Sequence, residues 1–170
     1  MIYCTARGER SGSEAVYALL DHAYRSEFGG VMPEIKKTSS GKPYFPVFPY
    51  IHFSLSHSKT HVLCALSKDP VGADIESPRK ISRRTIDYFS KPEELLLFDP
   101  LDLWVLKESY IKLLGGTLPQ IKKIRFSRES KNGKIIAPDI SVKARLYHVG
   151  DCRAAVCMLG DEPPDSIEMI

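Results

Sequence analysis

Two carboxylates stand two positions apart in the segment 71–76, at Asp74 and Glu76. The apolar residues that alternate with them predict a β-strand, and residues two apart on a strand share a face, with Cα atoms about 7 Å apart. Two carboxylates on one face can bind one hard divalent cation. Because the same spacing also occurs on ordinary solvated strand faces, the pattern alone indicates no more than a candidate metal site.

A second pair of charged residues lies four positions apart in a segment with helical periodicity, at Glu108 and Lys112. This spacing places both side chains on one face of a helix, and Trp104 lies one turn earlier on the same stripe. A carboxylate beside an ammonium could act as a base and stabilise negative charge. The alternative is an exposed ion pair that stabilises the helix by about 0.2–0.5 kcal/mol.

Two further segments carry side chains that could bind an anion. Ser56 and His57 are neighbours on a predicted strand, so their side chains point to opposite faces and cannot form a nucleophile and its base. Either group could instead contact a phosphate. Gly41, Lys42 and Pro43 combine a flexible residue, a cation and a rigid ring, which fits either a nucleotide-binding loop or a simple turn.

These groups belong to a chain of 170 residues, the size of one domain. The composition is 43% hydrophobic and 26% charged, which excludes collagen-like, low-complexity and broadly disordered proteins. No apolar segment approaches the roughly 20 residues that span a bilayer, and the N-terminus lacks the apolar core of a signal peptide. We therefore expect a single cytoplasmic domain, residues 1–170, with reduced cysteines and no membrane partner.

The elements expected from periodicity and capping signals alternate irregularly, which predicts an α+β fold. A proline-rich, irregular connection is expected over residues 33–50. The helices are expected over residues 12–28, 79–89 and 101–114, with capping signals at Ser11, Asp99 and Ser90, and the strands over 51–56, 61–67, 71–76, 122–127, 142–147 and 153–159.

Taken in order, the motifs G-K-P, F-S-L-S-H-S, V-G-A-D-I-E and W-V-L-K-E-S-Y-I-K resemble those of the 4'-phosphopantetheinyl transferases, specifically the larger Sfp-type branch. The resemblance extends from about residue 41 to residue 118. It implies two similar α/β lobes with the active site between them, here approximately residues 1–68 and 69–170, with the first lobe reduced. The first half of Sfp-type enzymes is longer and carries basic residues for the 3'-phosphate of coenzyme A, and these have no secure equivalent here.

The resemblance also implies an enzyme of the holo-acyl-carrier-protein synthase type. Such enzymes transfer the 4'-phosphopantetheine arm of coenzyme A to a serine of an apo acyl or peptidyl carrier protein and release adenosine 3',5'-bisphosphate. Mg²⁺ or Mn²⁺ would be bound by Asp74, Glu76 and Glu108. Glu108 matches the general base, and Lys112 and His57 match groups that stabilise the reacting phosphates.

The residues that match contacts to coenzyme A come from all four motifs. Trp104 matches an aromatic side chain that supports the site. The implied contacts are Lys42, Pro43, Ser56, His57, Asp74, Lys107 and Lys112.

The charge distribution suits an acidic carrier protein. Residues 1–160 hold all 24 basic side chains and 17 of the 21 acidic ones, a formal charge of +7. We expect a monomer or a weak dimer. The basic group at Arg79, Lys80, Arg83 and Arg84 could receive an acidic helix of the carrier, or it could be a solvated face.

Two alternatives remain open from the sequence. The basic run Lys122, Lys123, Arg125 and Arg128 raises a nucleic-acid-binding module, although we expect no nucleic-acid partner because zinc spacings, RNA-recognition motifs and a basic recognition helix are absent. The other alternative is a protein of the same fold that binds coenzyme A without catalysing transfer.

Overall fold

The structure is a computed structural model that describes residues 1–170. Its elements are mixed α and β, as predicted. The helices are α1 (Gly12–Phe28), α2 (Arg83–Phe89), α3 (Pro92–Leu95), α4 (Pro100–Leu114) and the 3₁₀ helix η1 (Leu118–Lys123). The strands are β1 (Ile2–Ala6), β2 (Lys36–Lys37), β3 (Pro43–Tyr44), β4 (His52–His57), β5 (His61–Ser67), β6 (Val71–Glu76), β7 (Ser127–Arg128), β8 (Ile135–Ile136), β9 (Val142–Val149), β10 (Cys152–Leu159) and β11 (Glu168–Met169).

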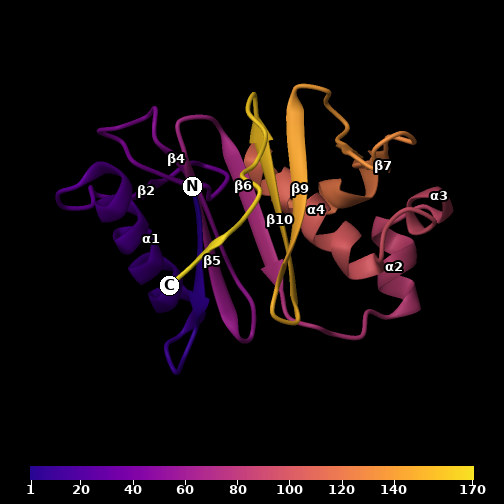
Figure 1. Ribbon diagram of the computed structural model, residues 1–170, viewed down its shortest axis with the longest axis horizontal. Helices are drawn as coiled ribbons and strands as arrows, with labels where there is room; N and C mark the ends of the chain where they lie inside the picture. The colour runs from indigo at the N-terminus through magenta and orange to yellow at the C-terminus, as the bar shows by residue number, and fades with distance from the viewer.

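Two main sheets lie side by side in the centre of the molecule (Figure 1). The first has the strand order β11-β1-β5-β4, and the second has the order β6-β10-β9. Helix α1 flanks the first sheet, whereas α2, α3 and α4 lie on the side of the second (Figure 1). The predicted strands 51–56 and 61–67 correspond to β4 and β5, which pair as an antiparallel hairpin, whereas β6 pairs with β10 in the second sheet.

The two sheets meet where β4 runs beside β6, and serine side chains join these strands. The Ser54 hydroxyl accepts a hydrogen bond from the Ala73 backbone nitrogen at 2.9 Å, and the Ser56 hydroxyl accepts one from the Ile75 nitrogen at 3.2 Å. The hydroxyls thus satisfy backbone groups that a neighbouring strand would otherwise pair. The junction between the sheets thus has a polar seam along β4 and β6, next to an apolar cluster that includes Leu63 of β5 and Val71 and Ile75 of β6.

Helix α1 begins and ends where the sequence predicts. The Ser11 backbone nitrogen donates to the Glu14 carboxylate at 3.0 Å, and the Glu14 nitrogen donates to the Ser11 hydroxyl at 3.3 Å, which completes a capping box. Gly29, with φ of 71°, ends the helix. Leu20 and Tyr24 face the first sheet and pack with Phe45 and other apolar side chains.

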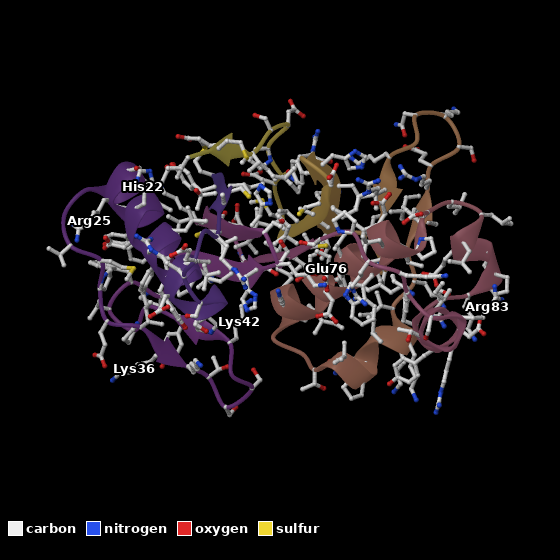
Figure 2. All side chains as sticks on the ribbon, turned by 90° about the horizontal axis from the view of Figure 1, so that it is seen from below. His22, Arg25, Lys36, Lys42, Glu76 and Arg83 are labelled. Carbon is white, nitrogen blue, oxygen red and sulfur yellow. The ribbon has the colours of Figure 1, made fainter.

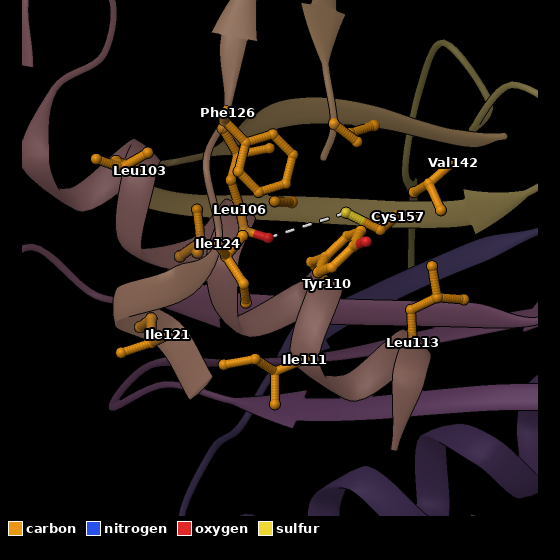
Figure 3. Close-up of a cluster of buried hydrophobic side chains, with 14 of the residues drawn as sticks. Leu103, Leu106, Tyr110, Ile111, Leu113, Ile121, Ile124, Phe126, Val142 and Cys157 are labelled. Carbon is orange, nitrogen blue, oxygen red and sulfur yellow. Dashed lines mark hydrogen bonds between the residues drawn. The ribbon is translucent and has the colours of Figure 1, made fainter. Parts of the chain in front are cut away.

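Helix α4 also matches its prediction and forms the centre of the second core. The Asp99 carboxylate accepts a hydrogen bond from the Leu101 nitrogen at 2.9 Å, and Gly115 ends the helix with a left-handed φ of 65°. Leu106 and Tyr110 pack in this core (Figure 3). Packing of the apolar face of α4 in this core therefore orients the opposite face of the helix toward the junction between the two sheets.

Gly72 lets α4 approach β6 closely. A Cβ atom at this position would lie 2.0 Å from the Ser109 carbonyl oxygen and 2.3 Å from the Leu113 nitrogen, distances that only glycine tolerates. The absence of a side chain therefore places the middle of α4 directly over β6.

The chain after β10 crosses back to the first sheet. Arg145 of β9 forms an ion pair with Asp165, and the Tyr147 hydroxyl donates to the Pro164 carbonyl at 2.6 Å. Strand β11 then pairs in parallel with β1. The acidic C-terminal segment thus connects the two sheets, and the first sheet includes residues from both ends of the chain.

The prediction of a strand over residues 122–127 is wrong. Residues 118–123 form the 3₁₀ helix η1, and only Ser127 and Arg128 are extended. Ile121 and Ile124 are both buried, and their spacing of three matches the 3₁₀ period. The second capping signal also shifts by one residue, because Lys91 precedes α3. None of the helices has the length and apolar character needed to cross a membrane.

Replacement of Gly72 by alanine should destabilise the protein by about 3 kcal/mol, because the added methyl group must push α4 away from β6. Urea denaturation of the variant and the wild type measures the change in the free energy of unfolding. Equal stability would show that the close approach of α4 to β6 is not required.

Candidate active site

Asp74 lies at the junction of the two sheets and joins three elements. Its Oδ1 atom accepts hydrogen bonds from the Ser56 hydroxyl of β4 and from the Lys112 ammonium of α4, both at 2.7 Å. Lys112 also donates to the Leu55 carbonyl at 3.3 Å. Asp74 is only 6% exposed, so the ammonium compensates a carboxylate that has little contact with water.

Glu76 lies one strand repeat further along β6 and is held from another direction. Its Oε1 atom accepts a hydrogen bond from the Trp104 indole nitrogen at 3.2 Å and lies 3.4 Å from the Arg79 guanidinium. The guanidinium is 5.2 Å from the centre of the Trp104 ring, which adds a cation–π contact. Trp104 therefore supports the site through a direct contact to one of the acids.

Glu108 faces the junction with part of its carboxylate unpartnered. Its Oε1 atom is buried without a hydrogen-bond partner, and so is Oδ2 of Asp74. Burial raises the pKa of Glu108 to about 7; the negative charge of Asp74 adds to this rise, and Lys112 opposes it. A carboxyl group with a pKa near neutrality can exchange a proton at physiological pH, which suits a general base.

The carboxylate oxygens that lack hydrogen-bond partners are candidate ligands for the divalent cation expected from the sequence. No group of three His, Cys, Asp or Glu side chains is arranged to hold an ion. Mg²⁺, however, typically takes one or two carboxylates and completes its shell with substrate phosphates and water. The two buried carboxylate oxygens that lack partners, one on Asp74 and one on Glu108, fit that requirement. The complete ligand set that includes Glu76 stays a prediction.

A cavity of about 230 Å³ lies beside these acids and brings together three of the predicted residues. Lys42 and Pro43 contribute from the proline-rich connection, and Lys112 contributes from α4. Lys42 and Glu76 both lie near the middle of the molecule, whereas Arg25 and Arg83 mark its two ends (Figure 2). The remaining lining residues are Ser40, Gly41, Phe53, Ser54, Leu55, Gly115 and Gly116.

Lys42 connects the cavity wall to the end of α4. Its ammonium donates to the Leu113 carbonyl at 2.7 Å, and burial lowers its pKa. This carbonyl belongs to the last turn of the helix, where the backbone has no intrahelical partner and carries partial negative charge. Lys42 thus fixes the position of the connection against α4.

His57 lies apart from the acids. Ser56 and His57 are successive residues of β4, so they leave the strand on opposite faces. The imidazole ring lies against the start of α1, where a Cβ atom on Gly12 would be 2.7 Å from it. His57 does not line the cavity, and its assigned role at a phosphate stays a prediction.

The structure does not bring Lys107 to the site, and the predicted contact with coenzyme A is wrong. Lys107 is fully buried, and its ammonium donates to the Phe89 carbonyl at 2.6 Å and to the Glu94 carboxylate at 2.8 Å. Glu94 also accepts from the Phe126 nitrogen at 3.1 Å. Lys107 therefore connects α4 to α3 and to the segment before β7.

Sequence reasoning missed two contributions to the site. Ser54 joins the strands through its hydroxyl, and Arg79 contacts Glu76. The sequence signal for Arg79 is its position three residues after Glu76, but spacing alone does not predict a contact in an irregular segment. Away from the site, sequence reasoning also missed that Glu94 neutralises Lys107.

Part of the basic run after α4 is engaged within the chain. The Arg128 guanidinium donates to the Leu97 carbonyl at 3.2 Å and to the Gly133 carbonyl at 2.9 Å, and it lies over the Phe98 ring. Arg125 donates to the neighbouring Ile124 carbonyl. These contacts give the run a structural role and do not favour the nucleic-acid alternative.

Replacement of Lys107 by methionine should lower the free energy of unfolding by about 3–5 kcal/mol, because Glu94 is left as a buried charge without its counter-ion. The matched control is the double variant Lys107→Met/Glu94→Gln, which removes both charges and should regain part of the loss. Urea denaturation measures both. Equal stability of the single and double variants would show that the buried charge is not the cause.

Replacement of Glu108 by glutamine should stabilise the metal-free protein more at pH 8 than at pH 5. The raised pKa means that the folded state binds a proton more tightly than the unfolded state, so the wild type loses stability as the pH rises through about 7. Glutamine removes this loss. Thermal unfolding of the variant and the wild type at both pH values measures the difference in stability. An equal difference at pH 5 and pH 8 would contradict the raised pKa of Glu108.

No family model matches the chain. It is 41% identical over 145 residues to 4'-phosphopantetheinyl transferase Sfp of Bacillus subtilis strain 168, an alignment that covers 76% of this chain and 65% of the relative. It is 37% identical over 90 residues to 4'-phosphopantetheinyl transferase gsp of Aneurinibacillus migulanus, covering 47% of this chain and 37% of that relative. The chain thus spans less than two thirds of the length of these curated relatives. Over most of its length the chain is therefore similar to the Sfp-type 4'-phosphopantetheinyl transferases.

Proposed function

We propose that this protein transfers the 4'-phosphopantetheine arm of coenzyme A to a serine of an apo acyl or peptidyl carrier protein. The observation that carries the proposal is the position of Lys112. Its ammonium bonds to Asp74 beside Glu108, and the same side chain lines the cavity with Lys42 and Pro43. One helix thus presents a base and a cation next to a space for an anionic ligand.

The reaction is a displacement at the β-phosphorus of coenzyme A. The serine hydroxyl of the carrier attacks this phosphorus while Glu108 accepts the hydroxyl proton. A bond forms between the serine oxygen and the phosphorus, and the bond from the phosphorus to the bridging oxygen of the pyrophosphate breaks. Adenosine 3',5'-bisphosphate leaves with the bridging oxygen, and Lys112 stabilises the negative charge on the pyrophosphate oxygens.

A bound Mg²⁺ or Mn²⁺ would neutralise the pyrophosphate and polarise its phosphorus–oxygen bonds. Asp74 and Glu108 would hold it through their unpartnered oxygens, with Glu76 as a further ligand. Lys42 and Pro43 would contact the adenosine side of coenzyme A. Because the cavity is smaller than the roughly 300–1,000 Å³ of typical ligand pockets, it would hold one end of the molecule.

The acidic carrier would bind near the segment that follows β6. Lys80, Arg83 and Arg84 lie in or just before α2. Arg83 marks the end of the molecule opposite Arg25 of α1 (Figure 2). This surface lies next to Glu76 along the chain, so an acidic helix bound there would bring its serine toward the acids.

We further propose that the two sheets mark the two lobes of the family fold, approximately residues 1–68 and 69–170, joined at β4 and β6, with β11 of the second segment returning to the first sheet. The packing of α1 on the first sheet and of α4 on the second supports this division. We also propose that the protein acts in the cytoplasm as a monomer or a weak dimer.

Incubation with an apo carrier protein, coenzyme A and Mg²⁺, followed by mass spectrometry of the carrier, tests the proposal. We expect the carrier to gain the mass of phosphopantetheine. Failure with apo carriers from fatty acid, polyketide and nonribosomal peptide synthesis would contradict it, and tight, salt-dependent binding to RNA or DNA would favour the alternative instead.

Glu108→Gln should reduce the rate of transfer by about 10²–10⁴-fold, because the variant cannot accept the proton. Lys112→Gln should reduce it by about 10²–10³-fold. The matched control is Lys36→Gln, a change at an exposed lysine of β2, which should leave the rate unchanged. A near-normal rate for Glu108→Gln would remove this residue from the mechanism.

A further inference from the structure

Two of the three acids at the junction are already paired with cations of the protein. Lys112 lies 2.7 Å from Asp74, and Arg79 lies 3.4 Å from Glu76. Part of the negative charge that would attract a divalent cation is therefore compensated by the chain itself.

The two cations are held to different degrees. Lys112 makes a short contact and also donates to the Leu55 carbonyl. The contact of Arg79 is longer, and Arg79 lies in the irregular connection between β6 and α2, whereas Lys112 lies in a helix. Arg79 can therefore leave its carboxylate at lower cost than Lys112 can.

Glu76 stays anchored when Arg79 leaves. The Trp104 indole nitrogen donates to the same Oε1 atom at 3.2 Å, and Trp104 belongs to the rigid helix α4. All hydrogen bonds that Glu76 accepts through its side chain go to Oε1. Its other carboxylate oxygen accepts no hydrogen bond and is free to bind a cation, so the guanidinium opposes the cation through its charge and not by occupying this oxygen.

We propose that Arg79 is a displaceable counter-ion of the cation site. It neutralises Glu76 when no divalent cation is bound, and it turns from Glu76 to the pyrophosphate of coenzyme A when the cation binds. This role rests on the proposed function, because it requires a divalent cation at the three acids.

The consequence is coupling between two ligands. A divalent cation beside Glu76 repels the guanidinium, and a guanidinium released near a pyrophosphate presents five N–H donors that suit phosphate oxygens. Binding of the cation releases Arg79 toward the pyrophosphate, and binding of the pyrophosphate draws Arg79 away from Glu76. Each ligand therefore favours binding of the other. Coupling of this kind is reciprocal, so the cation strengthens coenzyme A binding by the same factor by which coenzyme A strengthens cation binding.

Trp104 provides a direct readout, because it is the only tryptophan of the chain and contacts both Glu76 and Arg79. Its fluorescence would be titrated with Mg²⁺ in the absence and in the presence of coenzyme A, without any carrier protein. For the wild type we expect Mg²⁺ to bind about fivefold or more tightly when coenzyme A is present.

The decisive variant is Arg79→Gln. It should bind Mg²⁺ alone about fivefold more tightly than the wild type, and the enhancement by coenzyme A should shrink toward one. Arg79→Lys should behave like the wild type, because it keeps the charge. The matched control is Arg83→Gln, which removes an exposed arginine paired with Asp87 and should change neither constant.

The possible results separate the two proposals. Weaker or unchanged Mg²⁺ binding by Arg79→Gln, with a normal response of the wild type, would overturn the role of Arg79 and leave the proposed transfer intact. A wild type that binds no Mg²⁺ in the presence of coenzyme A would overturn both. Calorimetric titration of the same variants checks that the fluorescence change reports binding.

Discussion

The contact of Asp74 with Ser56 and Lys112 is the interaction on which the rest of the structure depends. It joins a strand of the first sheet, a strand of the second sheet and helix α4 at one carboxylate oxygen. A buried carboxylate needs such partners, because its loss of hydration is otherwise uncompensated. The position of α4 is fixed independently by the close approach at Gly72. The charged junction and the glycine contact thus require the same placement of the helix.

The polar character of the junction has a functional consequence. Strands that pair through a backbone ladder leave no side chain between them, whereas β4 and β6 are connected through the hydroxyls of Ser54 and Ser56. Ser54 and Leu55 of β4 line the cavity, and Asp74 of β6 contacts the charged Lys112. The same feature that joins the two sheets therefore also provides the surface on which an anionic substrate and a cation would meet.

Capping signals and alternation predicted most of this arrangement. Ser11 and Asp99 mark the starts of α1 and α4, and the alternation around Asp74 predicted β6. Lys107 shows the limit of motif matching, because it adjoins Glu108 in sequence yet points into the opposite core. Adjacent residues of a helix diverge by about 100°, so both could not face one site. The contact of Arg79 with Glu76 depends on the backbone path of the irregular segment after β6, which no local pattern specifies.

Asp74 and Glu76 each use one carboxylate oxygen for hydrogen bonds and leave the other without a hydrogen bond. Oδ1 of Asp74 is bonded to Ser56 and Lys112 while Oδ2 has no partner, and Oε1 of Glu76 receives every hydrogen bond that this side chain accepts. One oxygen fixes the side chain and the other stays available. A carboxylate with both oxygens satisfied would be more stable but could bind neither a cation nor a proton. The pKa of Glu108 is raised because burial removes hydration that its protein partners do not replace. The site thus retains an acid that is less stable as a charged group but able to take up a proton.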